Sequence, residues 1–308
     1  MEINNTPTIS ISVITYNQEN FIAETINGIL SQKINFSIEI IITDDNSTDN
    51  TAKICREFAS KNNNIIFHQN ETNIGLMKNF VGTLDKCSGK YIAICEGDDY
   101  WTDVNKLQKQ VDFLEGNESF VACFHEVSVI RDNQIIKERR LELTEDIFTF
   151  ADLAKGNFVA TLSLVFRNIF KHNFPSWIIE CKVADYPLIL SLAQHGKFKY
   201  FKDIMGVYRH QPTGSYFNSS IKNWIANIML PTYVIIYNNV FEANKRNIKA
   251  SILKERMQLY KIEKKFLRYL ITNIKLFWFT DITGYSWKNH VYYIKDYFIK
   301  NIHTYLNE

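Results

Sequence analysis

The first 95 residues alternate short apolar segments with amphipathic ones, and this alternation constrains the fold more than any other feature. Four runs rich in β-branched and apolar residues are typical of buried strands: Thr8–Thr15, Ile38–Thr43, Ile65–His68 and Tyr91–Cys95. Three segments with apolar residues at helical spacing lie between them and begin near Glu19, Ala52 and Leu76. Strands that alternate with helices predict a parallel sheet with right-handed crossovers. The sequence therefore predicts an α/β fold in which the carboxyl ends of these strands share one edge.

The rest of the chain predicts additions to this sheet and then a helical extension. Strand-like segments follow at Phe120–Ile130, Ile135–Leu143 and Ala160–Phe166, with a closing strand pair at Phe198–Phe201 and Met205–Arg209. Helical patterns occupy Asn105–Glu115, Thr149–Lys155 and a segment that opens at Asp185. After Ser215 the patterns are helical: Ile221–Val240, Lys245–Ile274 and Trp287–His303. With a boundary expected at Tyr216–Asn218, we predict one domain over residues 1–215 and a helical region over residues 216–308.

The composition is that of an ordinary globular chain, with 46% hydrophobic and 22% charged residues. Five scattered cysteines without a CxxC pair favour reduced thiols in a cytosolic setting over a disulfide framework or a zinc site. The first residues show no basic start followed by an apolar block, and no run of about 18 apolar residues occurs. We therefore expect a cytoplasmic protein without a spanning helix.

The net charge of +2 hides an uneven distribution along the chain. Residues Lys245–Glu308 carry 13 Lys and Arg against 5 Asp and Glu, a balance of +8, so the preceding residues sum to −6 (2 − 8). Aromatic residues are interleaved with these basic ones, and three roles stay open: a helical cap on the core, a homodimer contact, or a peripheral contact with the inner face of the plasma membrane. Nucleic-acid binding is not expected, because no recognition motif occurs and the bases follow helical spacing.

Acidic side chains gather where two of the first four predicted strands end. Glu96, Asp98 and Asp99 directly follow Tyr91–Cys95, and Asp45 lies in the DDNSTD stretch after the second strand. In open α/β sheets, ligands bind in the crevice beyond the carboxyl ends of the strands. Magnesium is often held there by one or two carboxylates together with substrate phosphates. The alternative is a solvated turn, but the convergence of TYN, DDNSTD and EGDD at one edge favours a metal–phosphate site.

Four segments, in this order, resemble the family 2 glycosyltransferases: ISVITYNQENFIAETINGILSQ, IEIIITDDNSTDNT, KYIAICEGDDYW and ADYPLILSLAQHGKFKYFKDIMGVYR. The resemblance covers about residues 8–215. It implies the GT-A fold, a Rossmann-like mixed sheet flanked by helices, here with a C-terminal helical extension. It also implies transfer of a sugar, with inversion, from a nucleotide-diphosphate donor to a hydroxyl of a sugar or lipid-linked glycan. A divalent cation, Mg²⁺ or Mn²⁺, would assist, and the setting would be assembly of a bacterial surface polysaccharide.

The resemblance also assigns roles to single residues. Thr15 and Tyr16 would contact the base and ribose of the donor, with the Tyr16 ring as a stacking surface. Asp45 would accept a hydrogen bond from the base, which favours a UDP-sugar because uracil has a ring N–H. The acidic motif of the family matches Glu96, Asp98 and Asp99, of which Asp98 and Asp99 would hold the metal. Asp185 would be the general base, and Arg209 with His210 would approach the diphosphate and the metal.

The sequence departs from the family pattern at two positions. Glu96 stands where the family has Asp, and His210 follows Arg209 directly, one position earlier than the usual spacing. Other interpretations remain for several residues. Asp185 could be a helix cap and Asp45 a turn former. Thr161–Arg167 is a candidate border of the acceptor site, and we interpret the remaining histidines, His68, His125, His172 and His195, as structural.

Two other functions compete with sugar transfer. A nucleotidyltransferase that makes nucleotide sugars would need a glycine-rich basic loop after the first strand, and TYNQEN does not provide one. A catalytically silent sugar- or nucleotide-binding module would be expected to have lost the acidic sites, whereas Asp45, Asp98 and Asp185 are all present. The sequence thus favours an enzyme.

Overall fold

The computed structural model of the chain describes residues 7–131, 134–138, 141, 143–210 and 220–263, together with residues 265, 268, 271, 272 and 275. The chain divides into two compact units, Met1–Ser251 and Ile252–Glu308. The first unit contains the sheet and its helices. Of the second unit, the described part is mainly the end of α9 (Glu242–Ile262). The boundary expected at Tyr216–Asn218 and the helix expected at Trp287–His303 lie outside the described residues.

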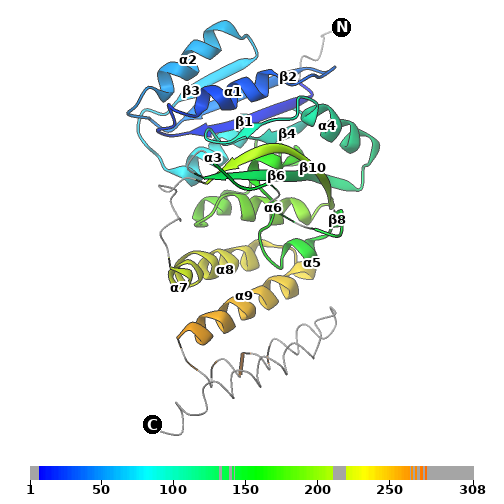
Figure 1. Ribbon diagram of the computed structural model, residues 1–308. Helices are drawn as coiled ribbons and strands as arrows, with labels where there is room; N and C mark the ends of the chain where they lie inside the picture. Colours follow the sequence, from blue (N-terminus) through cyan, green and yellow to red (C-terminus); the bar gives the residue numbers. More distant parts are fainter. Residues whose placement is uncertain are drawn as a thin grey trace. The chain divides into compact units, whose positions relative to one another are not determined.

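The described residues of the first unit form a ten-stranded mixed sheet, which Figure 1 shows from the side of α1. Its main path runs β3-β2-β1-β4-β9-β6-β10-β5, with β7 paired to β6 and β8 to β10. The strands are β1 (Ile9–Thr15), β2 (Ile38–Asp44), β3 (Ile65–Gln69), β4 (Tyr91–Ile94), β5 (Tyr100–Trp101), β6 (Phe120–Arg131), β7 (Gln134–Lys137), β8 (Ile147–Phe148), β9 (Val165–Arg167) and β10 (Lys197–Arg209). The first four strands are parallel, as predicted, whereas β9 runs antiparallel to both β4 and β6.

Helices cover the sheet and continue beyond it. They are α1 (Ile22–Leu30), α2 (Thr51–Lys61), α3 (Leu76–Leu84), α4 (Lys106–Gly116), α5 (Phe150–Leu153), α6 (Asp185–Ala193), α7 (Ile221–Trp224), α8 (Leu230–Asn239) and α9. A π-helical turn, Ile225–Met229, joins α7 to α8. Figure 1 shows α1 and α2 packed side by side over β1–β3, with α3 on the other side of these strands. Because both faces are covered, all seven residues of β1 are buried.

Three local predictions were wrong in detail. The expected closing pair is a single strand, β10, because two register shifts in its pairing with β6, around Ile204, accommodate the polar residues there without a turn. The segment expected as a strand from Ala160 is a 3₁₀ turn, Thr161–Ser163, followed by the short β9. The sequence also offers Ser47 or Thr48 as the cap of the second helix, but α2 begins after Asn50, and the Ser47 hydroxyl donates instead to the Asp44 carboxylate.

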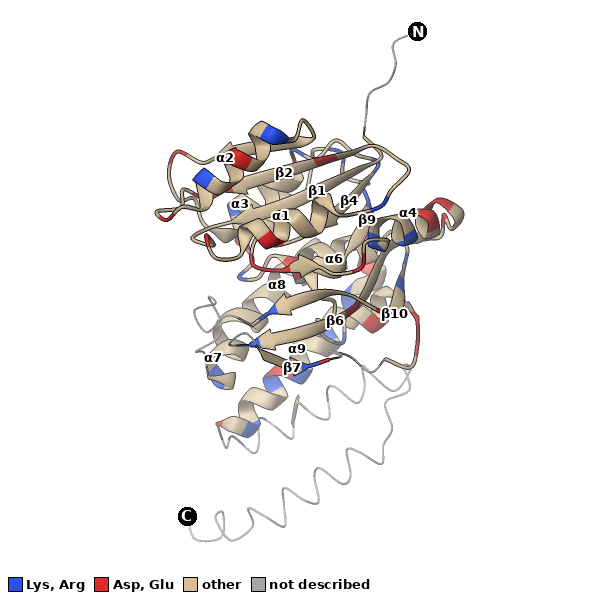
Figure 2. Cartoon of the chain, turned by 45° about the horizontal axis from the view of Figure 1, so that its top comes forward, with Lys and Arg blue, Asp and Glu red and all other residues tan. Residues whose placement is uncertain are grey.

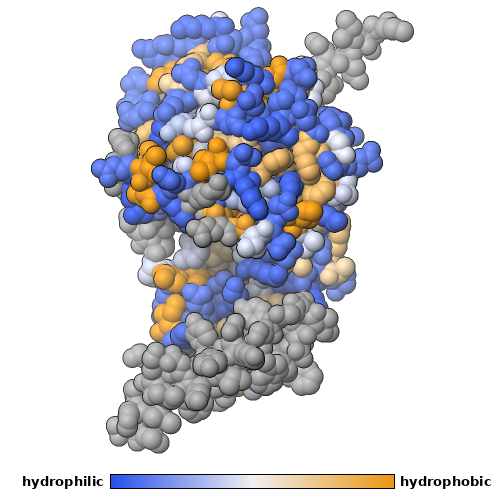
Figure 3. All heavy atoms as spheres, turned by 45° about the vertical axis from the view of Figure 1, so that its right-hand side comes forward, coloured by the Kyte–Doolittle hydropathy of each residue, from blue (hydrophilic) through white to orange (hydrophobic). Residues whose placement is uncertain are grey.

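None of the helices in the described part of the chain is both long enough and apolar enough to cross a membrane. On the face shown in Figure 3, the hydrophobic side chains that reach the surface form small separate groups among hydrophilic ones. This surface is that of an ordinary folded protein, in which scattered exposed apolar residues are normal.

Candidate active site

The carboxyl ends of β1 and β2 are tied together at the edge where the site was predicted. The two strands pair in parallel up to Thr15 and Asp44, and one residue later the Asp45 N–H donates to the Thr15 carbonyl at 2.9 Å. Thr15 itself is buried, and its hydroxyl donates to Oε1 of Gln18 at 2.7 Å. Thr15 and Asp45, two of the three residues predicted to contact the nucleoside, therefore lie side by side.

A second set of hydrogen bonds locks the loop after β1 to the loop after β2. The Asn17 N–H donates to the Ser47 hydroxyl at 2.8 Å, and the Thr48 N–H donates to Asn17 Oδ1 at 2.8 Å. Asn17 adopts a left-handed conformation with φ of 52°, which asparagine tolerates better than most residues. The lock leaves the preceding Tyr16 ring 45% exposed on a fixed backbone, as a stacking surface requires.

The Asp45 carboxylate organises the loop that leads into α3. Its Oδ1 accepts from the Asn70 amide at 2.8 Å and from the Ile74 N–H at 2.9 Å, and its Oδ2 accepts from the Gly75 N–H at 2.9 Å. The turn-forming role considered for Asp45 belongs instead to Asp44, whose carboxylate accepts from the Ser47 N–H at 3.0 Å. Asp45 thus brings residues 70–75 to the same edge, which the sequence pattern did not reveal.

The acidic loop, residues 95–99, packs closely against the end of β1. The Gly97 N–H donates to the Ile14 carbonyl at 3.0 Å. A Cβ atom on Gly97 would lie 2.3 Å from Gln18 Oε1 and 2.8 Å from Thr15 Oγ1, so a side chain at this position has no room. The three polar loops converge as predicted, and glycine permits the approach.

Glu96 and Asp98 are half-buried, unlike the fully buried Asp99, and Asp185 lies close enough to influence Glu96. Burial raises the pKa of Glu96 to about 8, assisted by the negative charges of Asp98 and Asp185. Burial also raises the pKa of Asp98, against the hydrogen bonds and the Arg209 charge that lower it. The fold therefore brings the predicted base, far along the chain, into the electrostatic range of the acidic motif.

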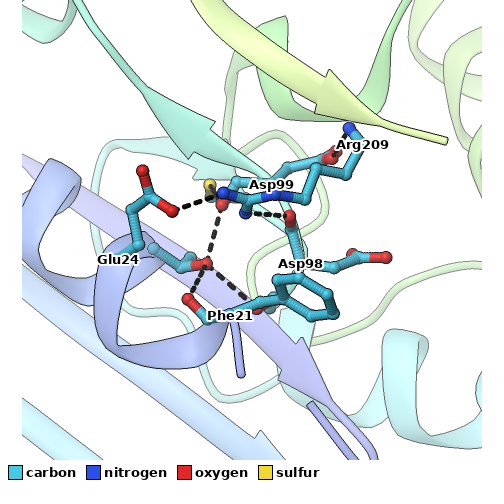
Figure 4. A network of polar contacts seen from close by, with 8 residues as sticks. Phe21, Glu24, Asp98, Asp99 and Arg209 are labelled. Atoms are coloured by element: carbon cyan, nitrogen blue, oxygen red, sulfur yellow. Dashed lines mark hydrogen bonds and ion pairs between the residues drawn. The ribbon is translucent and has the colours of Figure 1, made fainter. Parts of the chain in front are cut away.

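Asp99 differs from Asp98 because its side chain points into the protein. It is 1% exposed, and its Oδ1 accepts from the Arg209 N–H at 2.8 Å. Its Oδ2 has no hydrogen-bond partner among the described residues, and burial with the charges of Asp98 and Glu96 holds its pKa well above the usual range. In Figure 4 the Asp98 carboxylate points away from this network, so the two carboxylates face different surroundings.

Arg209 supports the acidic loop from behind. Its guanidinium lies over the Phe21 and Tyr100 rings, at 4.9 and 4.6 Å from their centroids, and donates to the Asp98 carbonyl at 2.7 Å (Figure 4). It also forms an ion pair with Glu24. These contacts position the loop, and direct contact of Arg209 with a donor remains a prediction.

His210 is held at the start of the following segment by its backbone. Its N–H donates to the Ile130 carbonyl at 2.8 Å, and burial together with the Arg131 charge lowers the pKa of its ring. Among the described residues, no three His, Cys, Asp or Glu side chains form a ready-made metal site. The carboxylates present instead fit a cation that is held by one or two protein ligands and completed by phosphate oxygens. A metal contact from His210 remains a prediction.

Asp185 is the first residue of α6, and the cap position belongs to Ala184. Its Oδ2 accepts from the Asn157 amide at 2.7 Å, and its Oδ1 accepts from the Tyr186 N–H at 2.8 Å. Hydrogen bonds to a carboxylate at a helix N-terminus favour its ionised form. Asn157 was not among the residues predicted for the site, since an asparagine after a glycine indicates only a loop.

Other candidates have structural surroundings. Residues 161–166 are buried, and the Arg167 guanidinium donates to the Phe120 carbonyl and the Tyr91 hydroxyl. A role of Thr161–Arg167 at the border of an acceptor site stays a prediction. His125 is buried with its Nδ1 against the Glu126 carbonyl. All five cysteines are free and buried, in keeping with the reduced thiols that the sequence predicts.

Comparison with known proteins identifies the family. The model of glycosyl transferase family 2 matches residues 10–174, more than half of the chain. The chain belongs to this family. A Mycobacterium tuberculosis protein named only as uncharacterized is 36% identical over 211 residues, 67% of this chain and 60% of that protein. The chain therefore spans about 60% of the length of the first curated relatives it matches.

Solved structures confirm the GT-A fold of this chain. S. aureus TarS in complex with UDP-GlcNAc aligns with a TM-score of 0.63 at 20% identity, over 88% of this chain and 81% of that chain. The mannosyltransferase PcManGT from Pyrobaculum calidifontis, in complex with GDP-Man and Mn²⁺, aligns with a TM-score of 0.59 at 14% identity, over 95% of this chain and 80% of that chain. At these identities the likeness establishes the fold and leaves the donor open.

Proposed function

We propose that this glycosyltransferase moves a sugar, with inversion, from a nucleotide-diphosphate donor to an acceptor hydroxyl in a cation-dependent reaction. The observation that carries the proposal is the convergence of the loops after β1, β2 and β4, where the Asp45 N–H donates to the Thr15 carbonyl and the Gly97 N–H donates to the Ile14 carbonyl. The influence of the Asp185 charge on the pKa of Glu96 supports a base close to the acidic loop. Nucleotide-sugar complexes of two structural neighbours support the choice of donor class.

In this reaction, Asp185 takes the proton from the acceptor hydroxyl while that oxygen attacks the anomeric carbon. The bond from the anomeric carbon to the β-phosphate oxygen breaks, and the nucleoside diphosphate leaves from the opposite face. The hydrogen bonds from Asn157 and Tyr186 hold the Asp185 carboxylate in position for this transfer. Attack opposite the leaving group accounts for inversion.

The leaving diphosphate develops negative charge, and the acidic loop would counter it through a cation. Asp98, with help from Glu96, would hold Mg²⁺ or Mn²⁺, which would supply charge neutralisation at the phosphate oxygens. Arg209 holds the loop in place through the Asp98 carbonyl.

At the other end of the crevice, Thr15, Tyr16 and Asp45 would bind the nucleoside. Tyr16 offers an exposed ring for stacking, and Asp45 offers a carboxylate to a base N–H, which favours a UDP-sugar. We further propose, from the family resemblance, that the acceptor is a sugar or lipid-linked glycan in the assembly of a bacterial surface polysaccharide.

The test measures nucleotide release from a panel of nucleotide sugars with Mn²⁺, with and without acceptors. We expect Asp185→Asn to lower kcat by about 100-fold or more while nucleotide binding is retained, because only proton transfer is lost. Asp98→Asn should lower both turnover and the affinity for the nucleoside diphosphate. Asp112→Asn removes an exposed carboxylate on α4 and serves as the matched control. No release from any donor, with nucleotide binding unchanged in Asp98→Ala, would favour a silent binding module instead.

A further inference from the structure

The Asp45 carboxylate has most of its hydrogen-bonding capacity occupied within the protein. An ionised carboxylate offers about four acceptor positions, two on each oxygen. Both positions on Oδ1 are taken, by the Asn70 amide at 2.8 Å and by the Ile74 N–H at 2.9 Å. One position on Oδ2 is taken by the Gly75 N–H at 2.9 Å. A single acceptor position remains, on Oδ2.

The Asn70 side chain cannot turn away from Asp45 without losing a second bond. Its amide nitrogen also donates to Asn79 Oδ1 at 3.1 Å, so both of its hydrogens are engaged. Asn79 is buried on α3, and its own amide donates to the Thr43 carbonyl at 3.3 Å. These hydrogen bonds, which link β2, α3 and Asn70, fix the orientation of the Asn70 amide so that its nitrogen faces the carboxylate.

The surroundings of Asp45 suit the edge of a planar ring. Asp45 is 3% exposed, so a ligand reaches only a small part of it. Two residues tied to Asp45 through the backbone have exposed apolar side chains: Tyr16 at 45%, after the Thr15 carbonyl, and Ile74 at 42%. A base whose edge meets Asp45 therefore finds apolar surface beside it.

We propose that Asn70, oriented by Asn79, is a specificity-determining residue that restricts Asp45 to one hydrogen-bond donor and so selects a base with a single ring N–H. Uracil and thymine present that donor at N3. Guanine presents two adjacent donors, N1–H and the N2 amino group, and a carboxylate pairs with both only when each oxygen has a free position. Cytosine presents an acceptor at N3, which the carboxylate repels. This inference rests on the proposed use of a nucleotide-diphosphate donor.

Isothermal titration calorimetry with UDP, dTDP, GDP and CDP, each with Mn²⁺, tests the selection in the unaltered protein. We expect UDP or dTDP to bind about tenfold or more tightly than GDP and CDP, the discrimination that one hydrogen bond gives. The tighter of UDP and dTDP then identifies the pyrimidine. Equal affinities for UDP and CDP, or for UDP and GDP, would overturn the proposal.

The variant Asn70→Ala tests the residue itself. Removal of its amide frees one position on Oδ1, so each Asp45 oxygen can accept one donor, and the ratio of UDP to GDP affinity should fall by roughly tenfold. Asn73→Ala is the matched control, because Asn73 Oδ1 accepts from the Gly75 N–H at 3.1 Å without occupying Asp45. The ratio within one variant does not depend on the fraction of folded protein. An unchanged ratio in Asn70→Ala would overturn the assignment.

The outcomes also separate this inference from the proposed function. Transfer from donors of both base types at equal efficiency would leave the glycosyltransferase mechanism standing and remove the role of Asn70. Failure of all four nucleotides to bind would contradict the donor class itself, and the inference with it.

Discussion

Gly97 determines how closely the acidic loop can approach the first strand. Its neighbours at the end of β1 and in the loop that follows, Thr15 and Gln18, occupy the volume that a Cβ atom would need. Gln18 makes two hydrogen bonds in this arrangement. Its side chain accepts from the Thr15 hydroxyl and also hydrogen-bonds to Asp98. The position of Asp98 therefore depends on Gly97, which has no side chain, and on the side-chain amide of Gln18, which belongs to no recognisable motif.

We expect Gly97→Ala to destabilise the protein by about 1–3 kcal/mol, the usual effect of overpacking, and to reduce turnover because the acidic loop shifts away from β1. Thermal unfolding and initial rates measure the two effects. Gly116→Ala is the control, since a Cβ atom there would meet nothing within 4 Å and alanine favours the helical conformation. Turnover and melting temperature both unchanged in Gly97→Ala would contradict the close packing described for this loop.

Helix α4 buries two polar residues whose burial the sequence does not predict. Leu107, Val111 and Leu114 face the core, as their spacing predicts. Lys106 and Gln110 are also buried, with the Lys106 Nζ 3.9 Å from the Trp101 ring centroid and without a hydrogen-bond partner among the described residues. Residue type predicts that both would be exposed. Tertiary packing under Trp101 buries them instead, and no periodicity in the sequence indicates this burial.

Lys106 should make stability depend on pH. Burial lowers the pKa of its amine to about 7, whereas the pKa of this amine in the unfolded chain is 10.5. Between these values the unfolded state binds more protons, so stability rises as pH increases from about 7, by up to roughly 2 kcal/mol at pH 9. Urea unfolding at pH 7, 8 and 9 should show this rise in the natural protein and lose it in Lys106→Met.

Lys109→Met is the matched control on the same helix. Lys109 is exposed and pairs with Asp103 at 2.8 Å, which raises its pKa and places its titration above the tested window. The same pH slope in Lys106→Met as in Lys109→Met would show that the buried amine does not titrate as expected.

At the level of elements, the predictable features were those with a repeating or positional signal. The four parallel strands, the loops at their ends and the helix at Asp185 all follow from periodicity and turn residues. The continuous β10 could not be predicted, because a polar bulge and a turn have the same local composition. Likewise Gln18, Asn70 and Asn157 reach the site only through long-range packing, and amide residues give no pattern that indicates such contacts.

On the scale of the whole molecule, most of the basic C-terminal segment lies beyond the unit that contains the site. The candidate site residues, from Thr15 to His210, fall in the first unit. The charge of +8 from Lys245 onward begins on α9, where Figure 2 shows basic residues recurring along the helix. A core cap, a homodimer contact and a peripheral membrane contact remain the alternatives for this segment.

Because the site draws on β1, β2, α6 and β10, a bound nucleotide should stabilise the first unit as a whole rather than one loop. With Mn²⁺ and UDP at 100 times its Kd, the expected gain is about 2.7 kcal/mol. For a unit of this size, that corresponds to a rise in Tm of roughly 5–10 °C. Differential scanning calorimetry measures it, with CDP as the matched ligand and Asp98→Asn as the matched variant, both expected to give smaller shifts. A Tm that does not change at saturating UDP would mean that nucleotide binds the unfolded chain equally well, which a site assembled from such distant segments cannot allow.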